Sequence, residues 1–222
     1  MGAMTRQAPA EPSRRDAGRT RADILDVATQ EFAENGYSGA RVDEIAARTR
    51  TTKRMIYYYF GGKEQLYIAV LERAYAEIRA AERTVAVEEL DPVAAIRRIA
   101  EITFDHHEAH PAFIRLVGAE NAQRGRHMTR VAGLVDLNSS AVGVLRGVLD
   151  RGQATGLFRD DVDALDVHMM ISAFCFFRVA NRHTFGALFG RDLLDPATRQ
   201  HYRTMVADMV AGYLGLRASG AG

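Results

Sequence analysis

Residues 51–60 combine cations, hydroxyl groups and tyrosines with a pair of apolar side chains. The stretch reads TTKRMIYYYF, so two threonines precede two cations and three tyrosines. A threonine hydroxyl in this place accepts a hydrogen bond from a first-turn N–H group and so starts a helix. On that helix Ile56 and Phe60 share a buried face, while the cations and Tyr57 lie outward. The outward groups suit the phosphates and base edges of a DNA major groove; a solvated basic surface helix is the alternative.

Two preceding segments would position this stretch. Residues 42–48 have apolar side chains along one side of a short predicted helix, and residues 49–50 form a tight turn. Residues 20–35 form a longer predicted helix, with a capping-box pattern at Thr20, an Asn-Gly stop and an apolar stripe interrupted only by Glu31. Three helices in about forty residues, the last two joined by a brief turn, are typical of a helix-turn-helix head whose final helix reads DNA.

Four sequence motifs then occur in order at characteristic spacings. They are ILDVA at 24–28, FAENGY at 32–37, VDEIA at 42–46, and IYYYF at 56–60 followed by a Lys-Glu pair. Over about residues 20–66 the chain resembles the TetR family of bacterial transcriptional regulators. The resemblance implies a sequence-specific DNA-binding regulator, a homodimer on a palindromic operator in double-stranded DNA, and most often a repressor released by a small-molecule effector. Effector, operator, regulated genes and the sign of regulation stay open.

The resemblance and the outward face of the recognition helix together select the residues expected to contact DNA. They are Arg41, Thr52, Lys53, Arg54, Tyr57, Tyr58, Tyr59 and Lys63. The chain departs from the family pattern at three positions. Arg54 replaces a small residue and Tyr59 a frequent histidine, and both add donors towards DNA. Arg50 replaces the usual turn glycine, which predicts either a turn without a positive φ or a slightly strained one.

Composition limits the class of protein. The 222 residues are enough for one large or two small domains with a sizeable core. The 29 lysines and arginines nearly balance 28 aspartates and glutamates, so the net charge of +1 excludes a uniformly basic nucleic-acid coat. A single cysteine, Cys175, provides no disulfide framework and favours a reducing compartment. Neither an apolar leader nor a run of about 18 apolar residues occurs, so we expect a cytoplasmic protein without a membrane span.

The chain divides by pattern into three parts. Residues 1–18 carry prolines, alanines and arginines without periodicity, which predicts a disordered basic arm. That arm either follows DNA, as homeodomain arms do, or has no specific role. Residues 19–65 hold the predicted helix-turn-helix domain. Residues 66–217 are expected to form a helical domain for effector binding and dimerisation.

Helical periodicity continues beyond the head, and no segment alternates like a strand, so we expect an all-α fold. The apolar stripes predict helices at about 63–83, 92–109, 111–123, 131–152, 163–188 and 195–214. The segment 163–188 is apolar nearly all round, which predicts burial on every side. The last two helices have more apolar surface than one subunit can cover, which favours a four-helix interface across a two-fold axis. Completion of a monomer core is the alternative.

An apolar cavity with a few placed polar groups is the usual small-molecule site, and the helical body offers candidates for one. Core packing is the alternative for each of them. Arg178 is distinctive because a buried arginine needs an anion, either a carboxylate of the protein or an acidic ligand. The residues expected to bind an effector are Phe104, His107, Phe113, Met128, Phe174, Phe177 and Arg178.

A histidine cluster supports the one catalytic alternative, a metal-dependent enzyme or a ligand-binding helical protein. His106 and His110 share a helix face at a spacing that metal ligands use, with His107 beside them. Pro111 follows at once and no second cluster stands near, so we expect a helix-end cluster stabilised by the helix dipole. The sequence has no GxSxG, GxGxxG or phosphate-loop motif. We therefore expect no enzyme, no cofactor and no metal.

Overall fold

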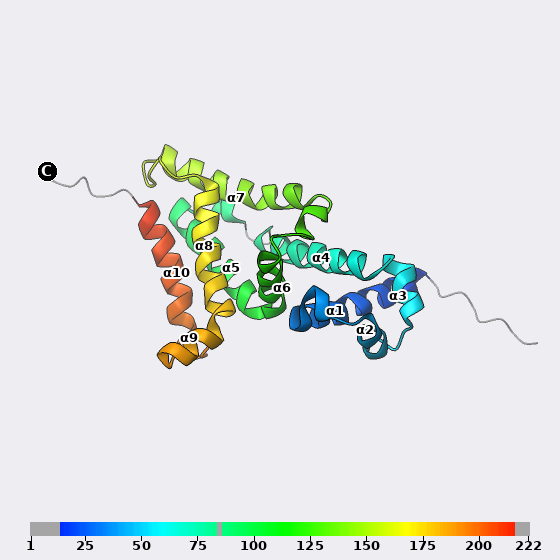
Figure 1. Ribbon diagram of the computed structural model, residues 1–222. Helices are drawn as coiled ribbons and strands as arrows, with labels where there is room; N and C mark the ends of the chain where they lie inside the picture. The colour runs from blue at the N-terminus through cyan, green and yellow to red at the C-terminus, as the bar shows by residue number, and fades with distance from the viewer. Residues whose placement is uncertain (1–13, 84–85, 216–222) are drawn as a thin grey trace, which may run out of the picture. The chain divides into compact units, whose positions relative to one another are not determined.

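The computed structural model describes residues 14–83 and 86–215, and its regular elements are helices (Figure 1). Within these ranges there is no β-strand, and Phe158 forms an isolated β-bridge with Gly215. The all-α prediction is therefore confirmed. The chain divides into two compact units, Met1–Val70 and Leu71–Gly222. The division falls slightly later than the boundary expected after residue 65.

Helix α1, Arg14–Gly39, begins earlier than the expected start at Thr20. Thr20 is not a cap, because its hydroxyl donates a hydrogen bond to the Asp16 carbonyl at 2.8 Å within the helix. A hydroxyl inside a helix reaches the carbonyl four residues back, so a threonine in this pattern need not mark a helix start. Residues 14–18, expected in the disordered arm, belong to α1. The rest of that arm, residues 1–13, lies outside the described ranges.

Glu31 does not weaken the apolar stripe of α1, because its buried carboxylate has partners on α2, Val42–Arg48. It is 6% exposed and accepts a hydrogen bond from the Arg41 backbone N–H at 3.1 Å. Its second oxygen lies 3.6 Å from a guanidinium nitrogen of Arg48. No side chain of its own caps α2, so Glu31 supplies the acceptor from outside the helix. At Gly36, φ 64° and ψ 175° break the helical backbone at the predicted Asn-Gly stop.

Helix α3, Lys53–Phe60, starts at Thr52, whose hydroxyl accepts a hydrogen bond from the Met55 N–H at 3.2 Å. The cap predicted from the threonine pair is therefore Thr52. The helix ends at Gly61, which has φ 85°. In the turn between α2 and α3, Arg50 has φ 53°, in the left-handed region. Of the two turns predicted for Arg50, the strained one is observed.

Arg50→Gly is expected to raise the free energy of unfolding by about 0.5 kcal/mol. The left-handed conformation costs an L-residue roughly 1 kcal/mol, and the greater freedom of glycine in the unfolded chain offsets part of the gain. Gly61→Ala is the opposite change and is expected to cost about 1–2 kcal/mol. Urea unfolding of the full chain measures both, with Arg50→Ala as the control that keeps a Cβ. A destabilised Arg50→Gly variant would show that side-chain contacts of Arg50 outweigh its backbone strain.

The second unit begins within α4 and, in the residues described, continues through six further helices. Their starts follow local signals: the Asp91 side chain accepts hydrogen bonds from the N–H groups of Val93 and Ala94, and Pro111 opens the helix after His110. The helices are α4 Lys63–Arg83, α5 Pro92–Ala109, α6 Pro111–Ala122, α7 Leu134–Ala154, α8 Ala164–Ala180, α9 Arg182–Phe189 and α10 Arg199–Leu214. Short 3-10 turns occupy Val87–Glu89 and Met128–Arg130.

The core of the second unit lies where α5, α8 and α10 run side by side, with α7 packed against α5 and α8 (Figure 1). Its buried side chains are mainly aliphatic and share the inward faces of these helices. They include Ile96, Ile99, Phe104, Leu145, Leu149, Val167, Ile171, Cys175, Val206 and Val210. The opposite side of α8 lies outside this core.

Three expectations about the late helices are wrong. The single helix expected over 163–188 is divided at Asn181, which ends α8 with φ −98° and ψ 6° and donates its side-chain N–H to the Phe177 carbonyl. Helix α8 is also not buried on every side, since Leu165, Met169 and Phe177 are 60%, 64% and 49% exposed. Helix α10 begins at Arg199, because Asp195 directs its carboxylate to the Ala197 N–H in a turn before it.

Candidate functional sites

The outward face of α3 is polar and open, as its sequence predicted. Ile56 and Phe60 are buried, while Tyr57 and Tyr58 are 41% and 78% exposed. Thr52, Lys53 and Arg54 at the start of the helix are exposed as well, and Arg41 is exposed at the start of α2. Tyr59 is half-buried, with its ring edge-on to Tyr58 at 5.4 Å between centroids. The structure thus brings seven of the eight residues expected to contact DNA onto α2, α3 and their caps.

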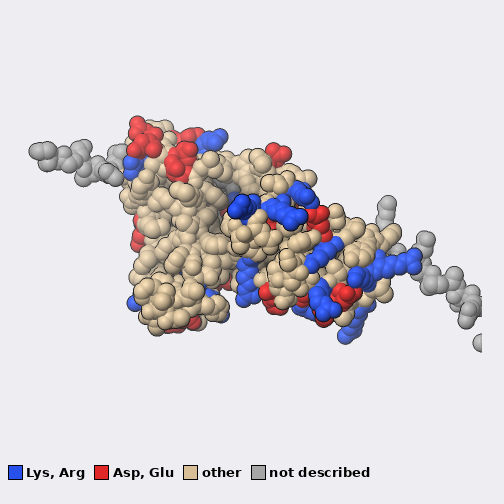
Figure 2. Space-filling view, in the orientation of Figure 1, with Lys and Arg blue, Asp and Glu red and all other residues tan. Residues whose placement is uncertain are grey.

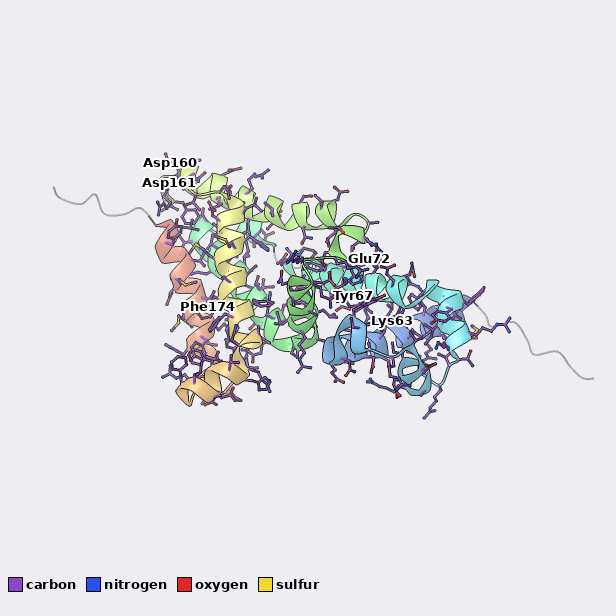
Figure 3. The ribbon with its side chains drawn as sticks, in the orientation of Figure 1. Lys63, Tyr67, Glu72, Asp160, Asp161 and Phe174 are labelled. Carbon is purple, nitrogen blue, oxygen red and sulfur yellow. The ribbon has the colours of Figure 1, made fainter. Side chains whose placement is uncertain are left out.

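The cations near α3 differ in how they are held. Lys53 forms an ion pair with Asp43 at 3.2 Å. Lys63, at the start of α4 (Figure 3), donates a hydrogen bond to the Ser38 carbonyl at 3.3 Å and lies 5.0 Å from the Tyr37 ring centroid. Burial lowers the pKa of Lys63, and the charge of Glu31 opposes that shift. Arg54 makes no ion pair with any residue in the described ranges, so its guanidinium is the more available group.

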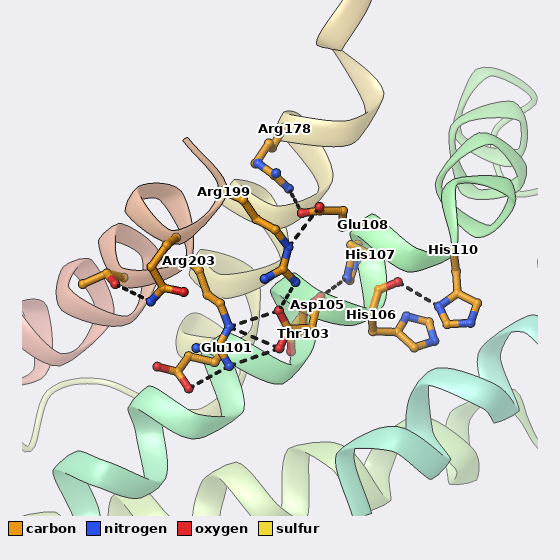
Figure 4. Close-up of polar contacts among 12 residues, drawn as sticks. Glu101, Thr103, Asp105, His106, His107, Glu108, His110, Arg178, Arg199 and Arg203 are labelled. Carbon is orange, nitrogen blue, oxygen red and sulfur yellow. Dashed lines mark hydrogen bonds and ion pairs between the residues drawn. The ribbon is translucent and has the colours of Figure 1, made fainter. Parts of the chain in front are cut away.

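Arg178 finds its anion within the protein. It is 2% exposed, its Nη1 lies 2.7 Å from an oxygen of Glu108, and its guanidinium stacks 4.2 Å above the Phe104 ring. Arg199 bonds the other oxygen of Glu108 at 3.1 Å and also reaches Asp105 (Figure 4). One of the two anions predicted for Arg178, a carboxylate of the protein, therefore lies against it. This network joins α8 and α10 to α5.

Among the cavities of the second unit in the described residues, two are lined by residues expected to bind an effector. The α4–α8 cavity has a volume of about 340 Å³ and is lined by Tyr75, Ile78, Arg79, His107, Phe113, Val117, Asn121, Asn138, His168, Met169, Ser172, Ala173 and Phe176. The α8–α10 cavity has a volume of about 610 Å³ and is lined by Met170, Ala173, Phe174, Phe177, Arg178, Phe185, Arg191, Leu193, Tyr202 and Met209. The first is bounded by five helices, whereas the second lies along the exposed side of α8.

The structure separates the residues expected to bind an effector. His107 and Phe113 line the α4–α8 cavity. Phe174, Phe177 and Arg178 line the α8–α10 cavity instead. The remaining two line neither: Phe104 is 1% exposed in the core, and Met128 lies in the 3-10 turn before α7.

His106 and His107, in the last turn of α5, are neutral. His106 is stacked on His110 with ring centroids 4.1 Å apart, and the His107 Nδ1 lies 2.7 Å from the Thr103 carbonyl oxygen. Burial lowers the pKa of His106 to about 3 and that of His107 to about 4. The expected stabilisation of charged histidines by the helix dipole is therefore outweighed by desolvation.

The metal-dependent alternative gains no support from the side-chain positions. Across residues 14–83 and 86–215, no group of three or more His, Cys, Asp or Glu side chains is placed to hold a metal ion. Burial raises the pKa of the Cys175 thiol to about 12, so the thiolate needed for nucleophilic chemistry is suppressed. Of the helices described, none is both long and apolar enough to cross a membrane.

Comparison with known proteins decides the family. A family model described as bacterial regulatory proteins of the tetR family matches residues 24–70, and one described as a tetracyclin repressor-like C-terminal domain matches residues 92–210. The chain belongs to the TetR family. It is therefore a DNA-binding transcriptional regulator with an N-terminal helix-turn-helix and a helical C-terminal domain, as the sequence motifs implied.

Individual TetR-family proteins resemble the chain over most of its length. The HTH-type transcriptional repressor NicS of Pseudomonas putida is 38% identical over 193 residues, which are 87% of this chain and 91% of NicS. The repressor SCO4008 of Streptomyces coelicolor is 32% identical over 72% of this chain and 78% of its own length. The crystal structure of the regulator SCO4942 from Streptomyces coelicolor matches with a TM-score of 0.68 and 30% identity, covering 88% of this chain and 98% of that one.

Sequence reasoning missed several residues of the α4–α8 cavity, above all Tyr75 and Arg79. Both lie on α4, one helical turn apart, beside the buried stripe of Leu71, Ala74 and Ile78. A charged residue next to an apolar stripe normally reaches out to solvent, so Arg79 resembled an ordinary surface residue. The signal available was its spacing from Tyr75, which places an aromatic ring and a cation on the same edge of the helix.

Proposed function

We propose that this TetR-family regulator is a homodimeric repressor that binds a palindromic operator in double-stranded DNA and is released by a small molecule in the α4–α8 cavity. The observation that carries the proposal is its 38% identity, over 87% of the chain, to the repressor NicS. A second similar protein, SCO4008, is also a repressor.

DNA contact is assigned to the exposed residues of α2 and α3. The N-terminal end of α3 presents Lys53 and Arg54 next to the capping hydroxyl of Thr52, where cations and N–H groups meet phosphates and base edges. Two such helices in a symmetric dimer read half-sites roughly 34–36 Å apart. The proposed contacts are Arg41, Thr52, Lys53, Arg54, Tyr57, Tyr58, Tyr59 and Lys63.

Dimerisation is assigned to α8 and α10. Their free side carries large apolar side chains that one subunit leaves exposed: Met169, Phe177, Met205, Met209 and Tyr213. In Figure 2 the surface over α8, α9 and α10 shows few charged side chains. Phe174, labelled on α8 in Figure 3, lines the apolar cavity on this side. An apolar patch of this kind marks an interface, and a second copy supplies the same patch by symmetry. Leu216, also expected on this face, lies outside the described residues.

Effector release is assigned to α4. The helix starts directly after the loop that ends the recognition helix and continues, as one helix, to Arg83. Its second half supplies Tyr75 and Arg79 to the α4–α8 cavity. A ligand in this cavity contacts α4, the helix that follows the DNA-binding residues. The ligand releases DNA if it binds more tightly to the conformation of the protein that does not bind DNA. The expected coupling is about 1–3 kcal/mol, and by linkage the operator weakens effector binding by the same factor.

Selection of bound duplexes from a random pool, followed by binding titrations, tests the DNA-binding assignment. Arg54→Ala is expected to alter the selected bases and to cost about 1–3 kcal/mol on the preferred site, whereas Lys63→Ala should weaken all duplexes alike. Lys63 must first leave Ser38, so its effect is expected to be the smaller one. Arg97→Ala, which removes an exposed cation from α5, is the matched control and should change neither property. An unchanged site and affinity in Arg54→Ala would remove Arg54 from base readout.

A further inference from the structure

Among the described residues that line the α4–α8 cavity, Arg79 is the only side chain that is formally charged at neutral pH. It is 4% exposed, and none of these described lining residues is a carboxylate. Burial lowers the pKa of both histidines in the lining, that of His107 to about 4, and the charge of Arg79 adds to each shift. Burial also raises the pKa of Tyr75, so that ring keeps its phenolic proton. The cavity therefore presents one cation among neutral groups.

The guanidinium of Arg79 is incompletely satisfied. Its Nη1 lies 2.8 Å from an oxygen of Glu82, a close ion contact, but neither Nη1 nor Nε of Arg79 donates a hydrogen bond. Burial of a guanidinium whose N–H groups donate no hydrogen bonds is unfavourable. We therefore expect a further acceptor to bind these N–H groups. Arg178 provides the comparison: its Nε and Nη2 also lack a hydrogen-bond partner, but its Nη1 donates to the Glu108 carboxylate at 2.7 Å and its guanidinium stacks on the Phe104 ring.

We infer that Arg79 binds the carboxylate of the effector, and that the effector is a small monocarboxylic acid with an apolar body. The inference rests on the proposed function, because it names the ligand class of the same cavity. A planar guanidinium matches a carboxylate through paired N–H donors. A second negative charge has no cation in the lining to pair with. Glu82 beside Arg79 and Glu120, whose charge acts on Tyr75, would repel it.

The remaining lining fits the body of such an acid. Ile78, Val117, Met169 and Phe176 are apolar, and the Phe113 ring lies edge-on to Tyr75 with centroids 5.3 Å apart. The volume of about 340 Å³ is at the small end of ligand pockets. Neutral His107 adds a directional group: its Nδ1–H donates to the Thr103 carbonyl, which leaves Nε2 as an acceptor. An acid whose apolar body is about the size of one ring, with or without a hydrogen-bond donor, fits this cavity.

Calorimetric titration of the full-length protein with acids and their neutral isosteres tests the inference. The probes are benzoate, 4-hydroxybenzoate, cyclohexanecarboxylate and octanoate, each paired with its primary amide, and terephthalate as a dianion. At least one acid is expected to bind at least tenfold more tightly than its amide, and terephthalate more weakly than benzoate. This comparison uses only the native chain, so it holds even where a cavity variant fails to fold. If no acid binds at millimolar concentration, or an amide matches its acid, the inference is wrong.

Arg79→Gln removes the charge and is expected to weaken binding of the best acid at least tenfold while leaving its amide unaffected. Arg191→Gln makes the same change in the α8–α10 cavity and should leave acid binding intact. Undiminished acid binding by a folded Arg79→Gln variant would overturn the assignment. Release of a selected operator is measured separately. An acid that binds through Arg79 without releasing DNA supports the site and contradicts effector release in the proposed function.

Discussion

The Met209→Glu variant is expected to lose its dimer and its operator binding while keeping its helical circular dichroism. Met209 is 40% exposed on α10 and lines the apolar α8–α10 cavity. In a symmetric interface the new carboxylate is buried twice against apolar side chains, which costs several kcal/mol, on the order of the penalty for a buried charge. The variant should sediment as a monomer or as an aggregate.

Loss of DNA binding follows because one short recognition helix contacts too few bases. Two helices held by a rigid interface make the second contact nearly intramolecular, so dimer loss removes most of the affinity. Thr204→Glu is the matched control. Thr204 is exposed one turn before Asp208, which pairs with Arg97 of α5, so the carboxylate is added to α10 on the side towards α5. This variant should stay dimeric. A native protein that sediments as a monomer at micromolar concentration yet binds one operator tightly would contradict the dimer.

The Glu108→Gln variant is expected to lower the free energy of unfolding by about 3 kcal/mol. The change keeps the shape of the side chain but leaves Arg178, 2% exposed, without its carboxylate at 2.7 Å. Breaking one side of a buried ion pair typically costs about 3–5 kcal/mol, and the lower value applies here because Glu108 itself is 23% exposed. Urea unfolding monitored by circular dichroism measures the loss.

A surface pair provides the control for this prediction. Arg97 and Asp208 are 40% and 56% exposed, so Asp208→Asn should cost less than about 1 kcal/mol. The double variant Glu108→Gln with Arg178→Met is expected to recover part of the lost stability, because no unpaired charge is then buried. A Glu108→Gln variant as stable as the native protein would mean that Asp105 and solvent compensate the charges of Arg178 and Arg199.

The sequence by itself determined those elements whose signals are local. The recognition helix starts at the predicted cap of Thr52, and α4 covers residues 63–83 as its stripe indicated. Helix α5 begins at Pro92 and ends before the predicted break at His110-Pro111. Helix caps, proline positions and helical periodicity depend on residues a few positions apart, so they can be read directly from the sequence. The family motifs lie in the same short segments.

The tertiary structure decided which polar side chains have a charged or hydrogen-bonding partner and which helix faces are exposed. The sequence shows Arg79 and Arg178 alike, as cations within apolar helices. Folding brings Glu108, 70 residues away in the chain, to accept a hydrogen bond from Nη1 of Arg178, whereas Nη1 of Arg79 lies beside Glu82 and donates no hydrogen bond. The sequence did not predict the exposed side of α8 for the same reason. A helix that is apolar all round does not indicate which of its sides is covered by neighbours. Burial and pairing depend on contacts between distant segments, and these exist only after the chain has folded.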